Sequence, residues 1–253
     1  MPSSMNVPKN VWLPLPIDLT LSRDEVHVWR THLDLPVSRI RSLQGTLAAD
    51  ELSRAARFHF PRDREHFIVA RGLLRAILSL YLRTEPSQLR FHYGSYGKPA
   101  LDTVSGQDTL SFNLSHSGGL VLYAITLGRK IGIDLERIRE DFEFEQLAER
   151  FFSPLENAAL RTLTSKLKQK AFFSYWTRKE AYLKARGEGL SIPSDRFDIP
   201  LAADEPSALL QIRGDPQEIS GWILQDLNPG PEYVAAVAVE GCDWRLNCWD
   251  YQA

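Results

Sequence analysis

Alternating apolar and polar residues predict a short strand near the middle of the chain. Residues 131–136 read Ile-Gly-Ile-Asp-Leu-Glu. Because successive side chains of an extended strand point to opposite faces, the two isoleucines and the leucine share one face, and Asp134 and Glu136 share the other. The pattern therefore predicts a strand that buries one face in the core and carries two carboxylates on the opposite face.

Apolar residues at helical spacing predict two long helices, over about 63–83 and about 168–185. Arg64, Arg71 and Arg75 share a separate stripe of the first helix. A stripe of arginines on a helix is typical of a solvated face. We therefore expect these three side chains to face water.

Capping patterns mark two helix starts. The segment Ser22-Arg-Asp-Glu25 has the spacing of a capping box and predicts a helix running toward Leu33. The segment Ser153-Pro-Leu-Glu156 combines an N-cap serine, a proline at the first helical position and a glutamate at the third. This second segment predicts a helix that begins at its proline.

Short apolar runs bounded by turn residues predict the strands. An edge strand is expected at 11–16, because prolines interrupt that run. The other expected strands lie near residues 88–93, 110–114, 119–126, 208–213, 221–227 and 233–239. Each half thus gives a helix, a turn, a long helix and a strand hairpin, which indicates a weak internal duplication. We divide the chain into an N-terminal half, 1–128, and a C-terminal half, 129–253.

The composition is typical of an ordinary globular protein, with 43% hydrophobic and 25% charged residues among 253. A formal net charge of −2 gives no global electrostatic case for nucleic-acid binding. Cys242 and Cys248 lie in one strand-like run, where extension separates their Cα atoms by about 20 Å, too far for a disulfide. We therefore expect two free thiols.

Compartment and membrane association follow from the same composition. Free thiols fit a reducing compartment, and the absence of Cys/His clusters argues against zinc. The N-terminus lacks the apolar core of a signal peptide, and no run reaches the ~18 apolar residues of a membrane span. We expect a cytoplasmic protein.

Three carboxylates are candidates for a metal site. Asp134 and Glu136 lie on the central strand, and Glu180 lies one helical turn before Lys184 in the segment Trp176-Thr-Arg-Lys-Glu-Ala-Tyr-Leu-Lys184. This donor set suits Mg²⁺, which keeps several waters and completes its octahedron with substrate phosphates. Simpler interpretations exist, since an isolated Asp-x-Glu is usually a solvated strand face, and Glu180 with Lys184 is usually a surface ion pair.

Two polar turns supply candidate phosphate ligands. The segment Phe112-Asn-Leu-Ser-His-Ser-Gly-Gly119 can present hydroxyl, imidazole and backbone N–H donors to a phosphate. The segment Tyr96-Gly-Lys-Pro-Ala-Leu101 holds Lys98 between a glycine and a proline, so that a cationic tip projects from a stiffened backbone. Together with the carboxylates, these turns indicate a site for a phosphate ester or anhydride.

In order and spacing, four blocks resemble the motifs of the surfactin-type (Sfp-like) 4′-phosphopantetheinyl transferases. The blocks are Gly97-Lys98-Pro99, Phe112–Ser117, Ile131–Glu136 and Trp176–Lys184. The last two are highly specific in combination. The resemblance implies an α+β fold of two halves related by a pseudo-twofold axis, with the active site in the cleft between them.

The resemblance also implies the reaction. Such an enzyme transfers 4′-phosphopantetheine from coenzyme A to a serine of an apo acyl, aryl or peptidyl carrier protein and releases 3′,5′-ADP. Mg²⁺ would be held by Asp134, Glu136 and Glu180 against the pyrophosphate. Glu180 is expected to be the general base, directly or through a bound water, and Lys184 to meet the pyrophosphate and stabilise the leaving group.

The coenzyme A contacts follow from the same resemblance. Lys98 and His116 match family positions that hold the coenzyme A phosphates, and Asn113 and Ser115 would contribute neutral hydrogen bonds. Gly97, in the same motif as Lys98, is also expected to bind coenzyme A.

The 3′-phosphate of coenzyme A requires further cations. Arg54 aligns with a basic family position and is the first candidate, and the arginine stripe of the 63–83 helix is the alternative. Many relatives carry a basic residue where this chain has Glu51. Recognition of the 3′-phosphate is therefore expected to rest on fewer contacts.

Two other classes of function share some of these features. A non-catalytic module that binds coenzyme A or a carrier protein would lose its carboxylates first, yet all three are present with Lys184. A magnesium-dependent phosphodiesterase or nuclease would use the same carboxylates, but the chain lacks a basic surface and a histidine acid pair. We also expect a monomer, because the duplicated chain can build both sides of a cleft that small trimeric relatives assemble between subunits.

Overall fold

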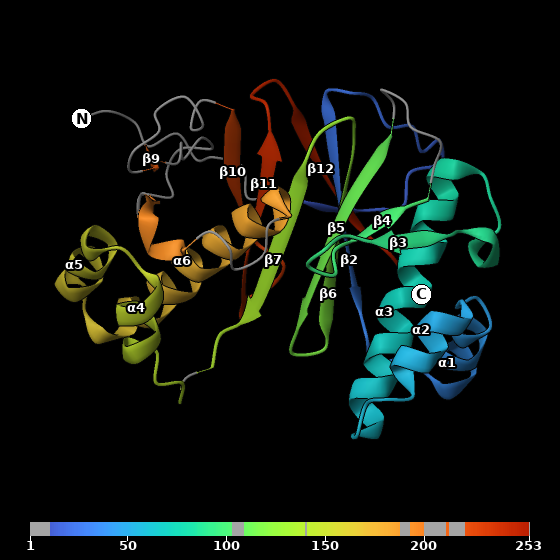
Figure 1. Ribbon diagram of the computed structural model, residues 1–253, viewed down its shortest axis with the longest axis horizontal. Coiled ribbons are helices and arrows are strands. Elements are labelled where there is room, and N and C mark those ends of the chain that lie inside the picture. The colour runs from blue at the N-terminus through green and yellow to red at the C-terminus, as the bar shows by residue number, and fades with distance from the viewer. Residues whose placement is uncertain are drawn as a thin grey trace.

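The computed structural model describes residues 11–102, 109–139, 141–187, 193–199, 211–212 and 221–252. Its architecture is mixed α+β, which confirms the expected class. Each half packs one 22-residue helix against a sheet, α3 (Pro61–Leu82) in the first half and α6 (Ser165–Arg186) in the second (Figure 1). The long helices flank the molecule, and the strands lie between them.

The first sheet has five strands in the order β1-β12-β2-β6-β5. Their bounds are β1 (Trp12–Pro14), β2 (Glu25–His32), β5 (Leu110–Ser117), β6 (Leu120–Leu127) and β12 (Arg245–Asp250). β12 runs parallel to both neighbours, and its Cys248 pairs with Trp12 on one side and Val28 on the other. The last strand of the chain is therefore inserted in the sheet of the first half, and the division at residue 128 remains a prediction.

The second sheet has three antiparallel strands, β10 (Trp222–Leu227), β11 (Tyr233–Glu240) and β7 (Ile131–Arg137), with β11 in the middle. Its edge strand β7 lies beside β5, the edge strand of the first sheet, and the Ile133 N–H donates to Asn113 Oδ1 at 2.8 Å across this junction. The described residues also form two short ribbons, β3 (Phe91–Tyr93) with β4 (Pro99–Leu101) and β8 (Phe197–Asp198) with β9 (Gln211–Ile212).

Short helices precede each long helix in the same order. They are α1 (Val37–Gln44) and α2 (Ala49–Ala55) before α3, and α4 (Glu145–Phe151) and α5 (Pro154–Thr162) before α6, with 3-10 turns at Pro86–Gln88 and Ser194–Arg196. The expected start of α5 is confirmed, because the Glu156 N–H donates to Ser153 Oγ and the Ser153 N–H donates to the Glu156 carboxylate. In the described segments, no helix is long and apolar enough to cross a bilayer.

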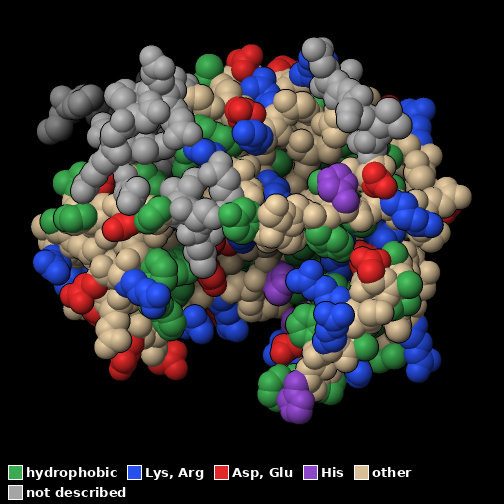
Figure 2. All heavy atoms as spheres, in the orientation of Figure 1, with side chains coloured by type: hydrophobic (Ala, Val, Ile, Leu, Met, Phe, Trp, Pro, Cys, Tyr) green, Lys and Arg blue, Asp and Glu red, His purple; other side chains and the backbone are tan. Residues whose placement is uncertain are grey.

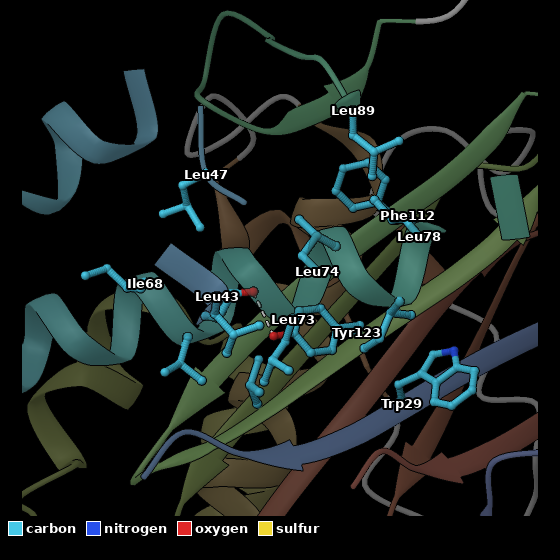
Figure 3. Close-up of a cluster of buried hydrophobic side chains, with 14 of the residues drawn as sticks. Trp29, Leu43, Leu47, Ile68, Leu73, Leu74, Leu78, Leu89, Phe112 and Tyr123 are labelled. Atoms are coloured by element: carbon cyan, nitrogen blue, oxygen red, sulfur yellow. Dashed lines mark hydrogen bonds between the residues drawn. The ribbon is translucent and has the colours of Figure 1, made fainter. Parts of the chain in front are cut away.

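Apolar side chains fill the space between these layers. Figure 3 shows the cluster where the buried face of α3 meets the first sheet, with Leu73 and Leu74 near Tyr123, whose hydroxyl donates to Ala70 O at 2.8 Å. A second cluster joins the two sheets and includes the predicted core face of β7, since its two isoleucines and its leucine are at most 1% exposed. The other face of β7 is thereby left for α6 and the carboxylates.

The helix predicted from Ser22 toward Leu33 is wrong. The capping contact does form, because the backbone N–H and hydroxyl of Ser22 donate to Glu25 Oε2 at 3.0 and 2.6 Å. However, the residues after it form β2, a strand with neighbours on both sides. Val26 and Val28 are fully buried, and burial within the sheet outweighs a local cap. The strand expected near 208–213 lies mostly outside the described residues, with β9 at 211–212.

Candidate active site

The junction of β5 and β7 pairs hydroxyls with carboxylates. Alternate residues of β5 face β7, so that Ser115 Oγ lies 2.9 Å from Asp134 Oδ1 and Ser117 Oγ lies 3.0 Å from Glu136 Oε2. Ser117 also accepts from the Arg137 N–H at 3.1 Å, so its proton is directed to Glu136. The sequence pattern alone gave no role to Ser117, although its position two residues after Ser115 places it on the same face.

Helix α6 brings Glu180 and Lys184 to the same junction because Gly132 lets it approach β7 closely (Figure 1). A Cβ at Gly132 would lie 2.1 Å from Ala181 O and 2.3 Å from Ala185 N, distances that no side chain tolerates. Gly132 is therefore required for α6 to place Glu180 beside Asp134 and Glu136.

Lys184 pairs with Asp134 rather than forming the simple helix-surface pair with Glu180. Its Nζ lies 2.6 Å from Asp134 Oδ1 and donates to Ser115 Oγ at 3.1 Å. Asp134 is only 4% exposed, and its second oxygen, Oδ2, has no hydrogen-bond partner. A buried carboxylate oxygen without a partner is costly, and a bound cation would offset that cost.

The three carboxylates influence one another. Burial, followed by the charge of Asp134, raises the pKa of Glu136 and also that of Glu180. Lys184 opposes this effect on both groups. Carboxylates that raise one another's pKa in a poorly solvated site are stabilised by a bound cation.

A magnesium ion fits this donor set through waters rather than as a closed cage. In the described part of the chain, no three acidic, histidine or cysteine side chains converge as ready ligands. Mg²⁺ commonly binds through one or two carboxylates plus waters and substrate phosphates, so a complete protein cage is not required. The unpartnered Asp134 Oδ2 would be one such ligand, and Glu136 and Glu180 lie near it.

Lys98 contacts backbone carbonyls. Its Nζ donates to Ile131 O at 2.9 Å and to Lys184 O at 2.7 Å, and burial lowers its pKa to about 8. The side chain thus ties the β3–β4 ribbon to β7 and to the end of α6. A phosphate at this position would have to compete with the two carbonyl oxygens.

Three cavities surround this ribbon and the β5–β6 turn. The first, of about 250 Å³, is lined by Gly97, Lys98, Asn113, Glu180 and Lys184 among others. The second, of about 600 Å³, contains Arg54, Arg57 and Gly97. The third, of about 370 Å³, contains Arg62, His66, His116 and Arg137.

The cavities are neighbours along one path. Gly97 borders the first and second, and Phe58 borders the second and third. In the orientation of Figure 1, Figure 2 shows a notch between the two halves with cationic and histidine side chains on its rim. His116 points away from the carboxylates because it alternates with Ser115 and Ser117, and partial burial, followed by the charge of Lys184, lowers its pKa.

The expectation of a solvated arginine stripe is wrong for two of its three members. Arg64 is exposed, but Arg71 and Arg75 are 5% and 1% exposed and both pair with Glu51. Glu51 is itself 1% exposed, so it is turned into the protein rather than toward a ligand. Glu51 belongs to a different helix, 20 residues before Arg71, so the periodicity of α3 alone could not reveal this ion triad.

A second buried ion pair supports α6. Lys179, next to Glu180, lies 2.9 Å from the Glu156 carboxylate and donates to Ser194 O and Phe197 O. Glu156 also accepts from the Ile199 N–H at 2.8 Å. The pair thus fixes α6 to the start of α5 and to the segment that follows the helix, which stabilises the placement of Glu180.

Comparison with known proteins assigns this arrangement to a family. Residues 36–127 match the family described as 4′-phosphopantetheinyl transferase, N-terminal, and residues 130–238 match the 4′-phosphopantetheinyl transferase superfamily. The chain is 47% identical over 243 residues to 4′-phosphopantetheinyl transferase HetI of Nostoc sp., covering 96% of this chain and 99% of that protein.

The chain also has more distant similarities. The chain is 28% identical to 4′-phosphopantetheinyl transferase Sfp of Bacillus subtilis, over 70% of this chain and 77% of that protein. The chain is also similar to the crystal structure of Thermotoga maritima holo-[acyl-carrier-protein] synthase, at 20% identity and a TM-score of 0.36, over 44% of this chain and 62% of that one. The family matches and the extended identity to HetI confirm the resemblance seen in the sequence: the chain belongs to the 4′-phosphopantetheinyl transferase superfamily.

Proposed function

We propose that this transferase takes 4′-phosphopantetheine from coenzyme A, uses Mg²⁺ held by Asp134, Glu136 and Glu180, and modifies a serine of an apo acyl, aryl or peptidyl carrier protein. One observation carries the proposal. Asp134, Glu136 and Glu180 lie close enough to influence one another's charge, and Glu180 and Lys184 border a cavity of about 250 Å³ where the two halves join. A cavity between two halves with convergent charged groups is a typical place for a phosphate substrate.

The proposed reaction is a phosphoryl transfer. The serine oxygen attacks the phosphorus that carries pantetheine, the bond from this phosphorus to the bridging oxygen breaks, and 3′,5′-ADP leaves with the electron pair. Glu180 accepts the serine proton, directly or through water, and the raised pKa that burial gives it suits this role. Lys184 places positive charge where the leaving group develops negative charge. A bound Mg²⁺ supplies charge neutralisation at the pyrophosphate.

The nucleotide part of coenzyme A is proposed to follow the cavities away from the carboxylates. Arg54 lines the second cavity and His116 lines the third, and the guanidinium group of the first and the imidazole N–H of the second are candidates for binding the phosphates. The first cavity is lined by Gly97, Lys98 and Asn113. To bind a phosphate, the Lys98 ammonium group has to give up a hydrogen bond to a backbone carbonyl, such as that of Ile131.

Intact mass spectrometry of carrier proteins tests the proposal. Purified chain, coenzyme A and Mg²⁺ are incubated with a panel of apo carrier proteins, and at least one carrier is expected to gain the mass of one phosphopantetheine group. Omission of the metal with a chelator present should abolish the gain. Binding of coenzyme A without any mass gain would indicate a binding module, and breakdown of coenzyme A without carrier modification would indicate a phosphodiesterase.

We also propose a monomer in the cytoplasm. The two cysteines, Cys242 and Cys248, are free, which supports a reducing compartment. Fractionation of cells that express the tagged full chain checks the location, and recovery of the chain in a membrane or secreted fraction would contradict it.

A further inference from the structure

The ion triad of Glu51, Arg71 and Arg75 fixes two guanidinium groups behind the second cavity. Arg71 Nε donates to Glu51 Oε1 at 2.7 Å, and Arg75 Nε donates to Glu51 Oε2 at 2.8 Å. Arg75 also donates to Pro86 O and Leu89 O at 2.8 and 3.0 Å. With so many charge-assisted bonds in a buried place, Arg71 has little freedom to move.

Arg71 in turn restricts the position of Tyr93. Its NH2 group donates to Tyr93 Oη at 3.0 Å, and its guanidinium carbon lies 4.8 Å from the centre of the Phe91 ring. Because the Tyr93 oxygen accepts this bond, its own proton remains available to donate. Burial raises the pKa of Tyr93, so the phenol keeps that proton. In the described part of the chain, no acceptor is found for it.

Tyr93 lies in the wall of a cationic cavity. The other side chains of that wall include Arg54, Arg57 and Asp50, which give two positive charges and one negative. Gly97 joins this cavity to the one that contains Glu180 and Lys184. Guanidinium groups and a hydroxyl donor next to a phosphoryl-transfer site suit a phosphate group of the donor substrate.

We propose that Tyr93 donates a hydrogen bond to a phosphate oxygen in the nucleotide part of coenzyme A, and that Glu51 and Arg71 are positioning residues that hold its phenol. This inference rests on the proposed function, because it takes coenzyme A as the donor. The proposal also assigns a role to the acidic residue Glu51. Glu51 does not meet the phosphate, but through Arg71 it orients a donor that does.

Tyr93→Phe tests the hydrogen bond. The variant should bind 3′,5′-ADP about 10-fold more weakly in calorimetry, the loss expected for one hydrogen bond to a charged group. In the transfer assay the KM for coenzyme A should rise by a similar factor while kcat is unchanged. Tyr251→Phe is the matched control, because Tyr251 packs against Trp29 and is not among the residues that line the second cavity, so the affinity of this variant for 3′,5′-ADP should equal that of the wild type. Unchanged 3′,5′-ADP affinity in Tyr93→Phe would overturn the inference.

Arg71→Met tests the positioning role. Glu51 keeps Arg75 as a partner in this variant, so no buried charge is left alone. If Arg71 acts through Tyr93, adding Tyr93→Phe to Arg71→Met should weaken 3′,5′-ADP binding less than twofold further. Additive losses would refute the positioning role. Arg71→Lys serves if the methionine variant does not fold, since it keeps the charge but lacks the planar fork, and the same non-additivity is expected.

The two levels of the proposal fail separately. A wild-type chain that modifies no carrier protein contradicts the proposed function. A wild-type chain that modifies carriers, with Tyr93→Phe indistinguishable from it in KM and in 3′,5′-ADP affinity, contradicts only the role of Tyr93.

Discussion

The carboxylate oxygens of the candidate site differ in their hydrogen-bond partners. We expect this difference to determine how strongly substitution of each carboxylate lowers activity. Asp134 Oδ1 lies within reach of both Ser115 and Lys184, whereas Oδ2 is buried with none. Glu136 has a hydroxyl donor in Ser117 and is partly accessible. If the proposed Mg²⁺ binds here, removal of Asp134 takes away its main protein ligand, whereas water can replace Glu136.

Asp134→Ala should lower transfer at least ~100-fold, because loss of an anionic metal ligand costs far more than loss of a surface pair. Glu136→Ala should cause a smaller loss, because Mg²⁺ accepts water in place of one ligand. Initial rates at saturating coenzyme A measure both. Glu149→Ala, which removes an exposed partner of Arg161, is the matched control and should be unaffected. Near-normal turnover of a folded Asp134→Ala variant would contradict the metal assignment.

His27 makes stability depend on pH, far from the carboxylates. It is 2% exposed, Nδ1 lies 2.9 Å from Tyr81 Oη, and that oxygen already accepts from Trp29 Nε1 at 2.7 Å. The Tyr81 hydroxyl therefore donates to a neutral imidazole. Burial lowers the pKa of His27 to about 4, although Glu25 acts in the opposite direction.

The sign of the pH effect follows from this lowered pKa. Between pH 6.5 and about 4 the unfolded chain takes up a proton that the folded protein does not, so the free energy of unfolding should fall as pH falls, by roughly 2–3 kcal/mol from this group. Urea unfolding of the wild type and His27→Leu at pH 7 and pH 4.5 measures it. The wild type should lose more stability than the variant on acidification, and equal losses would exclude His27 as the cause.

Among the elements, the contact between α6 and β7 decides the geometry of the site. The helix carries Glu180 and Lys184, the strand carries Asp134 and Glu136, and Gly132 sets how closely they approach. Since the helix backbone would be only 2.1 Å from an added Cβ, any side chain at position 132 has to displace the helix or the strand.

Gly132→Ala should therefore separate the helix from the strand and reduce kcat more than ~10-fold, because displacements of about 1 Å at a reacting centre have effects of this size or larger. Gly221→Ala is the matched control, because an added Cβ there meets no atom within 4 Å. Thermal unfolding of both variants shows whether the folds persist. Full activity in Gly132→Ala would mean that the helix position is not critical.

The same elements show what the sequence can and cannot predict. The α3 and α6 helices, β7 and the start of α5 follow from local periodicity and capping, and the four motifs identify the family. In contrast, β2 follows a capping box yet is a strand, because its neighbours in the sheet come from residues 120–127 and 245–250. Such long-range burial leaves no local signal.

The candidate site shows a similar limit. The motifs named the carboxylates and Lys184 individually, but their mutual placement depends on the crossing of β5, β7 and α6. The partners of Lys98 and the burial of Arg71 likewise come from segments distant in sequence. The sequence shows which of these residues are charged. Their hydrogen-bond and ion-pair partners are known only from the packing of the folded chain.

For the whole molecule, one chain supplies both sides of the active-site junction. β5 comes from the first half, β7 and α6 come from the second, and all the described site residues lie within this chain. Among the described residues, the candidate site of β5, β7 and α6 therefore takes no side chain from a second copy of the protein.

The wild type should therefore sediment as a single species of 28.8 kDa, with transfer activity per chain that does not change on dilution. Analytical ultracentrifugation across a wide range of protein concentrations measures the mass, and activity is assayed over the same range. An obligate trimer whose dissociated chains are inactive would contradict this expectation.

The position of β12 also determines when the protein can fold during synthesis. The backbone groups of β2 on one side have no strand to pair with until Arg245–Asp250 has left the ribosome. The first sheet should therefore close only after residues 245–250 have emerged, although most of its residues are made early. Ribosome-bound chains that end before residue 245 should be cleaved by protease throughout the first half, and chains extended by a C-terminal linker that clears the exit tunnel should resist. Equal resistance would show that β2 and β6 fold without the last strand.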